Sequence, residues 1–155
     1  MNDYISTINS TPNSVMTIIA TMYGTLLAIS IVVYIISVIA KWKQFTKAGE
    51  AGWKALIPIY NTYMEFKLYY NTNMFWIVLI TSIVYFVSIK LVPTIGAIVG
   101  IFYLIISFIA AIKLIARKAR SFGHGVGFAI GLFVFGVIFE CILAFDKSVY
   151  TKLEN

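Results

Sequence analysis

Four long runs of apolar residues divide the chain, and more polar segments separate them. The runs cover about 15–40, 74–89, 91–116 and 125–145. About 20 apolar residues in a helix cross the roughly 30 Å hydrocarbon core of a bilayer. Spanning β-strands would alternate apolar and polar positions, whereas these runs are continuously apolar. The pattern therefore predicts an all-α membrane protein, a single domain over 1–155 built as a bundle of four transmembrane helices.

The ends of the runs carry further signals. A secretory signal peptide is the alternative for the first run, but no basic residue precedes it and it is longer than the apolar part of a signal. We therefore expect an uncleaved first helix. Pro93 lies in the first turn of the third run, where its missing N–H costs nothing. The short connection from Lys90 to Val92 predicts a tight hairpin of the second and third helices.

The segment 41–72, between the first and second runs, predicts an amphipathic helical loop. Apolar side chains recur there at helical spacing: Trp53, Leu56, Ile57, Tyr60, Met64 and Leu68. Pro58 is expected to kink this element or divide it into two short helices. An interfacial connector in the headgroup region is the first interpretation. A surface that docks a partner, or a re-entrant gate, is the alternative, and its candidate residues are Trp53, Pro58, Tyr60 and Asn61.

Composition and charge support the membrane interpretation and orient the chain. Of 155 residues, 61% are apolar and 12% charged, against about half and a quarter in soluble domains. The chain has 12 Lys and Arg against 6 Asp and Glu, and nine of the twelve lie in the segments 41–72 and 113–124. Cytoplasmic loops collect basic residues, so we expect a multi-pass protein of the cell membrane with both termini outside. Anionic lipid headgroups, rather than nucleic acid, are the expected partner of these clusters.

Two ionisable residues are candidates for function. Glu140 is the one carboxylate inside a predicted span, where an unpaired charge is costly. It pairs with Lys90 or Lys147 at the outer boundary, extends toward water, or serves as a functional carboxylate. His124, the single histidine, lies at the inner end of the fourth run, as an interfacial residue or a pH sensor.

Small residues recur every four positions in several runs. At such spacing they let helix backbones approach closely in lipid. Packing within the bundle is the first interpretation and self-association the alternative. The glycines expected to pack are Gly24, Gly96, Gly100, Gly123, Gly127 and Gly131.

Two blocks of sequence resemble a known family. The first is Lys47-Ala48-Gly49 followed by Gly52-Trp53-Lys54-Ala55-Leu56-Ile57-Pro58-Ile59-Tyr60-Asn61, and the second is Arg120-Ser121-Phe122-Gly123 through Gly127-Phe128, with Leu143-Ala144-Phe145 later. Both are similar to an uncharacterised family of small bacterial membrane proteins, a domain of unknown function whose members are sometimes labelled signal-peptidase-like. The resemblance implies a four-helix membrane protein and no established catalytic residues.

The residues do not favour an enzyme. A Ser–Lys dyad needs a serine beside a desolvated lysine, and the nearest pairs, Ser88 with Lys90 and Ser107 with Lys113, lack a domain to bind a peptide. Cys141 is the only cysteine and His124 the only histidine, so we expect no disulfide and no metal site. We also expect no cofactor. The sequence predicts a non-enzymatic accessory or regulatory subunit of a larger membrane system, with another membrane protein or a second copy as its partner. The alternative is a small transporter or channel, formed by one copy or by an oligomer, with Glu140 in a polar path.

Overall fold

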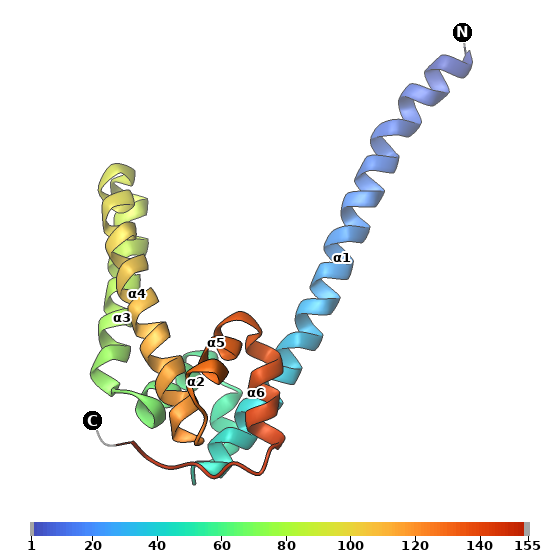
Figure 1. Ribbon diagram of the computed structural model, residues 1–155. Coiled ribbons are helices and arrows are strands. Elements are labelled where there is room, and N and C mark those ends of the chain that lie inside the picture. Colours follow the sequence, from blue (N-terminus) through green and yellow to red (C-terminus); the bar gives the residue numbers. More distant parts are fainter. Residues whose placement is uncertain (1, 154–155) are drawn as a thin grey trace. The chain divides into compact units, whose positions relative to one another are not determined.

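The computed structural model describes residues 2–153, with side chains from 14 to 153. Helices joined by short connections make up the described residues, which contain no strand (Figure 1). The elements are α1 (Asn2–Lys47), the 3-10 helix η1 (Gly52–Ala55), α2 (Pro58–Tyr69), α3 (Thr72–Leu91), α4 (Pro93–Ser121), α5 (Val126–Val134) and α6 (Gly136–Phe145). The predicted all-α class is confirmed.

Three of the described helices are long and apolar enough to cross a membrane: α1 from Ser14 to Lys47, α3 and α4. The chain is thus compatible with a membrane protein, but the predicted four-span bundle is not confirmed. The chain divides into two compact units, Met1–Ile36 and Ser37–Asn155. The contacts that build the candidate site all lie within the second unit.

Glycines end both α1 and α4 in the same way. Gly49 and Gly123 have positive φ angles of 78° and 76°. After Gly49, the Glu50 N–H donates to the Phe45 carbonyl at 2.9 Å, and after Gly123 the His124 N–H donates to the Ala119 carbonyl at 2.9 Å. Both are Schellman caps, which favour glycine because other residues are strained at positive φ. Gly123 therefore ends a helix, a role different from the helix packing that the sequence predicted.

Pro58 divides the loop between α1 and α3 into two helical pieces, as the sequence predicts. It is the first residue of α2, where its ring fits the helical φ and its missing N–H leaves no bond unmade. Asn71 then opens α3, and its side chain accepts a hydrogen bond from the Asn73 N–H at 2.8 Å. The loop therefore places α2 between η1 and the start of α3.

The helices α3 and α4 form the tight hairpin expected from the short connection before Pro93. The rings of Tyr85 and Tyr103 stack across it at 5.6 Å. A Cβ on Gly96 would lie 2.5 Å from the Cα of Ile89, and one on Gly100 would lie 2.9 Å from the Tyr85 ring. These two glycines thus let the helices approach closely. Gly24 lies in the first unit, where its predicted packing role stays a prediction.

The segment 125–145, predicted to be one transmembrane helix, forms the two short helices α5 and α6 instead. The backbone leaves helical geometry at Phe135, with φ −117° and ψ 44°, just before Gly136. The helix α6 folds back on α5. The rings of Phe128 and Phe139 contact each other there at a centroid distance of 4.9 Å, and the Phe139 ring lies against Gly131. With 9 and 10 residues, the helices are about 14 and 15 Å long, half a bilayer core.

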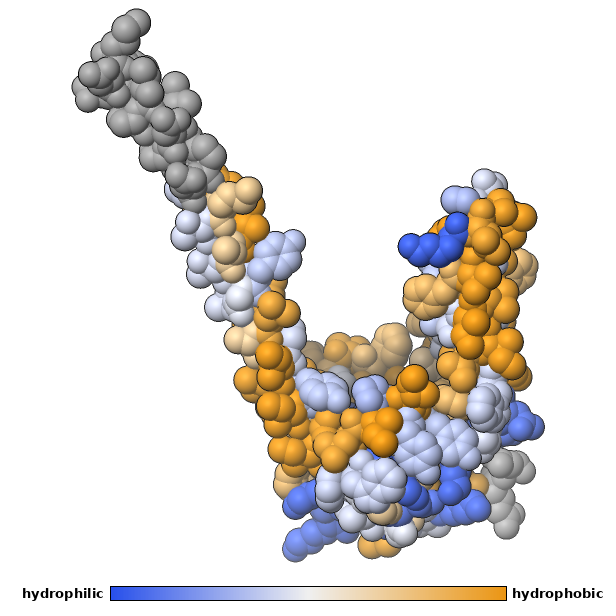
Figure 2. Space-filling view, turned by 180° about the vertical axis from the view of Figure 1, so that it is seen from behind, coloured by the Kyte–Doolittle hydropathy of each residue, from blue (hydrophilic) through white to orange (hydrophobic). Residues whose placement is uncertain are grey.

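The fold-back brings the C-terminal segment beside the loop. The Tyr150 hydroxyl donates to the Leu68 carbonyl, and the Thr151 N–H to the Ser121 carbonyl, both at 2.7 Å. The prediction that this segment lies across the membrane from the loop, with both termini outside, is therefore not confirmed. Figure 2 shows apolar residues over the α3–α4 hairpin, and hydrophilic residues over the end of the second unit that carries the loop.

We predict that the close approach at Gly96 is sensitive to one methyl group. Gly96→Ala should lower the free energy of unfolding by roughly 1–3 kcal/mol, because the new Cβ meets the Ile89 backbone. Gly127→Ala is the matched control, since a Cβ there meets nothing within 4 Å. Denaturant titration in mild detergent, followed by circular dichroism, measures both. Equal stability of Gly96→Ala and the wild type would contradict this packing.

Candidate functional site

A buried lysine lies at the centre of the second unit. Lys118, in the last turn of α4, is only 2% exposed. Its Nζ donates to Glu65 Oε1 on α2 at 2.9 Å and to the two carboxylate oxygens of Glu140 on α6 at 2.5 and 2.7 Å. One ammonium group therefore joins three helices.

Two side chains of α1 complete this charge network. Lys41 Nζ donates to Glu65 Oε2 at 3.2 Å. The Gln44 amide Nε2 donates to Glu140 Oε2 at 2.5 Å and to the Glu140 backbone carbonyl at 2.9 Å. We call Lys41, Gln44, Glu65, Lys118 and Glu140 the charge network. Its two lysines and two glutamates sum to zero net charge.

The local sequence explains why Lys118 points inward. It is four residues from both Leu114 and Phe122, so it shares their face of α4. That face packs on an apolar cluster that includes Ala119, Phe122 and Leu143. The ring of Tyr69 lies 5.3 Å from Lys118 Nζ, and burial raises the pKa of the Tyr69 phenol, which stays protonated.

The charge network keeps the carboxylate of Glu65 ionised. Burial acts to raise the pKa of Glu65. The charges and hydrogen bonds of Lys118 and Lys41 outweigh burial and lower this pKa to about 2. A buried pair of this kind need not stabilise more than apolar packing would, but removing one partner strands a charge and costs about 3–5 kcal/mol.

A second cluster surrounds Asp146 and closes the α5–α6 fold-back. Lys47 Nζ donates to Asp146 Oδ1 at 2.8 Å and to the carbonyls of Leu143 and Asp146 at 2.6 and 2.9 Å. It thus caps the C-terminal end of α6, where a positive charge is favourable. His124 Nε2 lies 3.0 Å from Asp146 Oδ2. Burial acts to raise the pKa of Asp146, but hydrogen bonds from Lys47, Ser148 and His124 lower it to about 2.

The loop candidates form a third group, away from the charge network's hydrogen bonds. The Trp53 and Tyr60 rings stack at 6.2 Å with planes 6° apart, and Tyr60 contacts Tyr63 at 5.7 Å. Asn61 Oδ1 is buried and has no hydrogen-bond partner in the described part of the chain. Nearby, Glu50 pairs with Lys54 and Lys67, whose hydrogen bonds lower its pKa.

The structure changes the expected environment of Glu140. The sequence offered Lys90 or Lys147 as a boundary partner, but the partner is Lys118, because α6 turns back toward the loop. His124 belongs to the Asp146 cluster and not to the charge network. Sequence reasoning missed Lys118 itself. The available signal was a lysine at helical spacing from Leu114 and Phe122, on an otherwise apolar face.

The hydrogen bonds of Lys118 hold helices together. A lysine that acts as a base must be neutral with a free lone pair, whereas Lys118 Nζ donates to three carboxylate oxygens. Among the residues with described side chains, no three His, Cys, Asp or Glu residues lie together so as to hold a metal ion.

Comparison with known proteins identifies a family of unknown function. A model described as a family of unknown function (DUF5684) matches residues 53–152. The matched region contains η1 from Trp53, α2 to α6, and both glutamates of the charge network. No curated protein and no solved structure matches the chain.

We predict that Lys118 and Glu140 are energetically coupled. Lys118→Met leaves Glu140 without an opposite charge, and Glu140→Met leaves an excess positive charge, whereas the double variant restores neutrality. The double variant should be more stable than the sum of the single effects predicts, by about 1–3 kcal/mol. Unfolding free energies in detergent measure this.

The same cycle with Lys113→Met is the control. Lys113 lies on the same helix but is exposed, and no ion pair of it occurs among the described residues. Its effect should add to that of Glu140→Met. Additive effects for Lys118 would show that the pair does not stabilise the fold as described.

Proposed function

The chain belongs to a family of unknown function, DUF5684, so we propose a role for it from its own residues. We propose a non-enzymatic integral membrane protein that acts as an accessory or regulatory subunit of a larger membrane system. The resemblance of its loop to small bacterial membrane proteins supports the cell membrane of a bacterium as its location.

The closed charge network is the observation that carries this proposal. Its two ammonium groups and two carboxylates bind one another and, with Gln44, hold four helices in place. Such a site supports a stable platform in the membrane rather than a reaction centre. A platform that does no chemistry itself is suited to positioning or regulating another membrane protein.

The proposed topology has three spans and a re-entrant hairpin. We propose that α1, α3 and α4 cross the membrane, and that α5 and α6 enter from the loop side and return to it. The Lys47–Asp146 ion pair supports this, because it keeps the C-terminal segment beside the loop. Eleven of the twelve basic residues then lie on one side, all except Lys90. That side is cytoplasmic by the charge rule, with the N-terminus outside and the C-terminus inside.

One observation favours the transporter or channel hypothesis instead. Interrupted helices in membrane proteins often form transport sites at the bilayer midplane. The last apolar segment is interrupted in this way between α5 and α6. The break itself carries Phe135 and Gly136, which offer no polar side chain. Glu140 lies past it and is neutralised by Lys118. We therefore place this hypothesis second.

Affinity purification and flux measurements separate the two hypotheses. The tagged protein, extracted from native membranes, should retain a heterologous membrane protein at constant stoichiometry through a second purification step. The same protein in liposomes should give no more ion flux than empty liposomes. Flux that disappears in Glu140→Gln but persists in Glu50→Gln, its control outside the network, would overturn the accessory role and support transport.

A further inference from the structure

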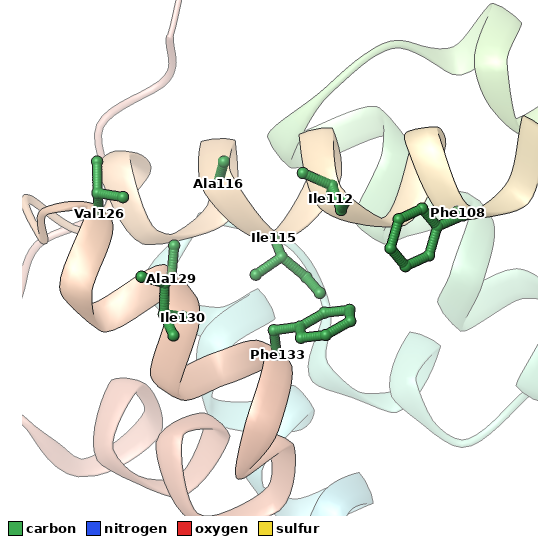
Figure 3. A pocket seen from close by; sticks show the side chains of 8 residues that line it. All are labelled: Phe108, Ile112, Ile115, Ala116, Val126, Ala129, Ile130 and Phe133. Atoms are coloured by element: carbon green, nitrogen blue, oxygen red, sulfur yellow. The ribbon is translucent and has the colours of Figure 1, made fainter. Parts of the chain in front are cut away.

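An apolar groove runs between α4 and α5. It has a volume of about 260 Å³ and is lined only by apolar side chains. Phe108, Ile112, Ile115 and Ala116 come from α4, and Val126, Ala129, Ile130 and Phe133 from α5 (Figure 3). The groove is separate from the charge network, whose side chains do not line it.

The two ends of the groove differ. The Phe108 and Phe133 rings meet at one end, with centroids 6.2 Å apart and planes 80° apart. Ala116 and Val126 lie at the other end (Figure 3). The α4 side is about 12 Å long from Phe108 to Ala116. The groove, which we also call the slot, is therefore short and apolar. It begins near the loop side of the fold, where α4 ends and α5 begins.

Two cations lie beside the end of the slot marked by Ala116. Arg120 is four residues after Ala116 and Lys113 three before it, so both are its neighbours on the surface of α4. Both side chains are exposed, and within residues 14–153 no ion pair of either one occurs. They differ in this from Lys118, which Glu65 and Glu140 neutralise. An apolar slot thus opens beside two uncompensated positive charges.

We infer that this groove binds an anionic phospholipid of the leaflet on the loop side. One acyl chain lies in the slot between α4 and α5, and the phosphate pairs with Lys113 and Arg120. Charge complementarity selects this occupant, since basic pockets between helices on the cytoplasmic side attract anionic headgroups. A zwitterionic headgroup brings its own cation and gains less. The inference requires the membrane insertion proposed above but is independent of the accessory role.

The expected selectivity follows from the two cations. Each basic residue near an anionic surface contributes about 1 kcal/mol. Removing both therefore corresponds to roughly a 30-fold loss of affinity, at 1.4 kcal/mol per tenfold. Arginine also binds a phosphate through two parallel hydrogen bonds, which fixes the headgroup as well as attracting it.

Native mass spectrometry of the purified protein, titrated with dioleoylphosphatidylglycerol or dioleoylphosphatidylcholine, tests the site. The wild type should bind the anionic lipid in preference to the zwitterionic one. The double variant Lys113→Gln/Arg120→Gln should lose roughly 30-fold in affinity for phosphatidylglycerol. Ala116→Phe, which fills the slot and keeps both charges, should lose binding of both lipids. Circular dichroism and elution volume verify that each variant is folded.

The matched control removes two other exposed lysines from the same side. Lys43→Gln/Lys152→Gln changes the net charge equally and should keep the lipid preference. An equal loss in this control would overturn the site, because bulk charge would then explain the binding. Retained binding in Ala116→Phe would overturn the groove as the place of the acyl chain. A dimer that Ala116→Phe dissociates, with no lipid bound to the wild type, would show that a second copy fills the groove.

Discussion

The buried ammonium group of Lys118 lies between the carboxylates of Glu65 and Glu140. The positions of α2, α4 and α6 relative to one another depend on this contact. A buried charge without a partner costs several kcal/mol, so each of the three residues constrains the other two. Glu65 holds α2 against the end of α4, and Glu140 holds α6 there. Lys41 and Gln44 extend the constraint to α1, so that the charge network joins four helices and has no net charge of its own.

The same constraint explains why the last apolar segment folds back. Extended as one helix, 125–145 would carry Glu140 away from Lys118 and leave Glu140 without an opposite charge in apolar surroundings. Lys118 would keep only Glu65 as its partner. Folded at Phe135, it returns Glu140 to Lys118 and Asp146 to Lys47 and His124. Glu140 lies within α6 and Asp146 follows its last residue. Ion pairs at these two places fix both the position and the direction of the helix. The stable platform that the neutral charge network holds together is the property from which we propose an accessory role.

The sequence predicted the features that depend on local chemistry. Continuous apolar runs predicted helices, Pro58 predicted the division of the loop, and Pro93 with its short connection predicted the hairpin. It did not predict the break at Phe135, because a straight apolar helix and a folded pair have the same composition. It did not predict the partner of Glu140 either. Lys118 lies 22 residues away, and the charge rule treats it as one more basic residue at the membrane surface, although its spacing places it on a buried face.

Side-specific cysteine labelling tests the fold-back most directly. In a Cys141→Ala background, Lys67→Cys reports on the loop, Lys90→Cys on the tip of the α3–α4 hairpin, and Lys152→Cys on the C-terminal segment. An impermeant thiol reagent is applied to intact cells and again after permeabilisation. The fold-back predicts that Lys152→Cys behaves like Lys67→Cys, protected until permeabilisation, while Lys90→Cys is labelled on intact cells. Labelling of Lys152→Cys together with Lys90→Cys on intact cells would mean that 125–145 crosses the membrane as a fourth span, and would contradict the account.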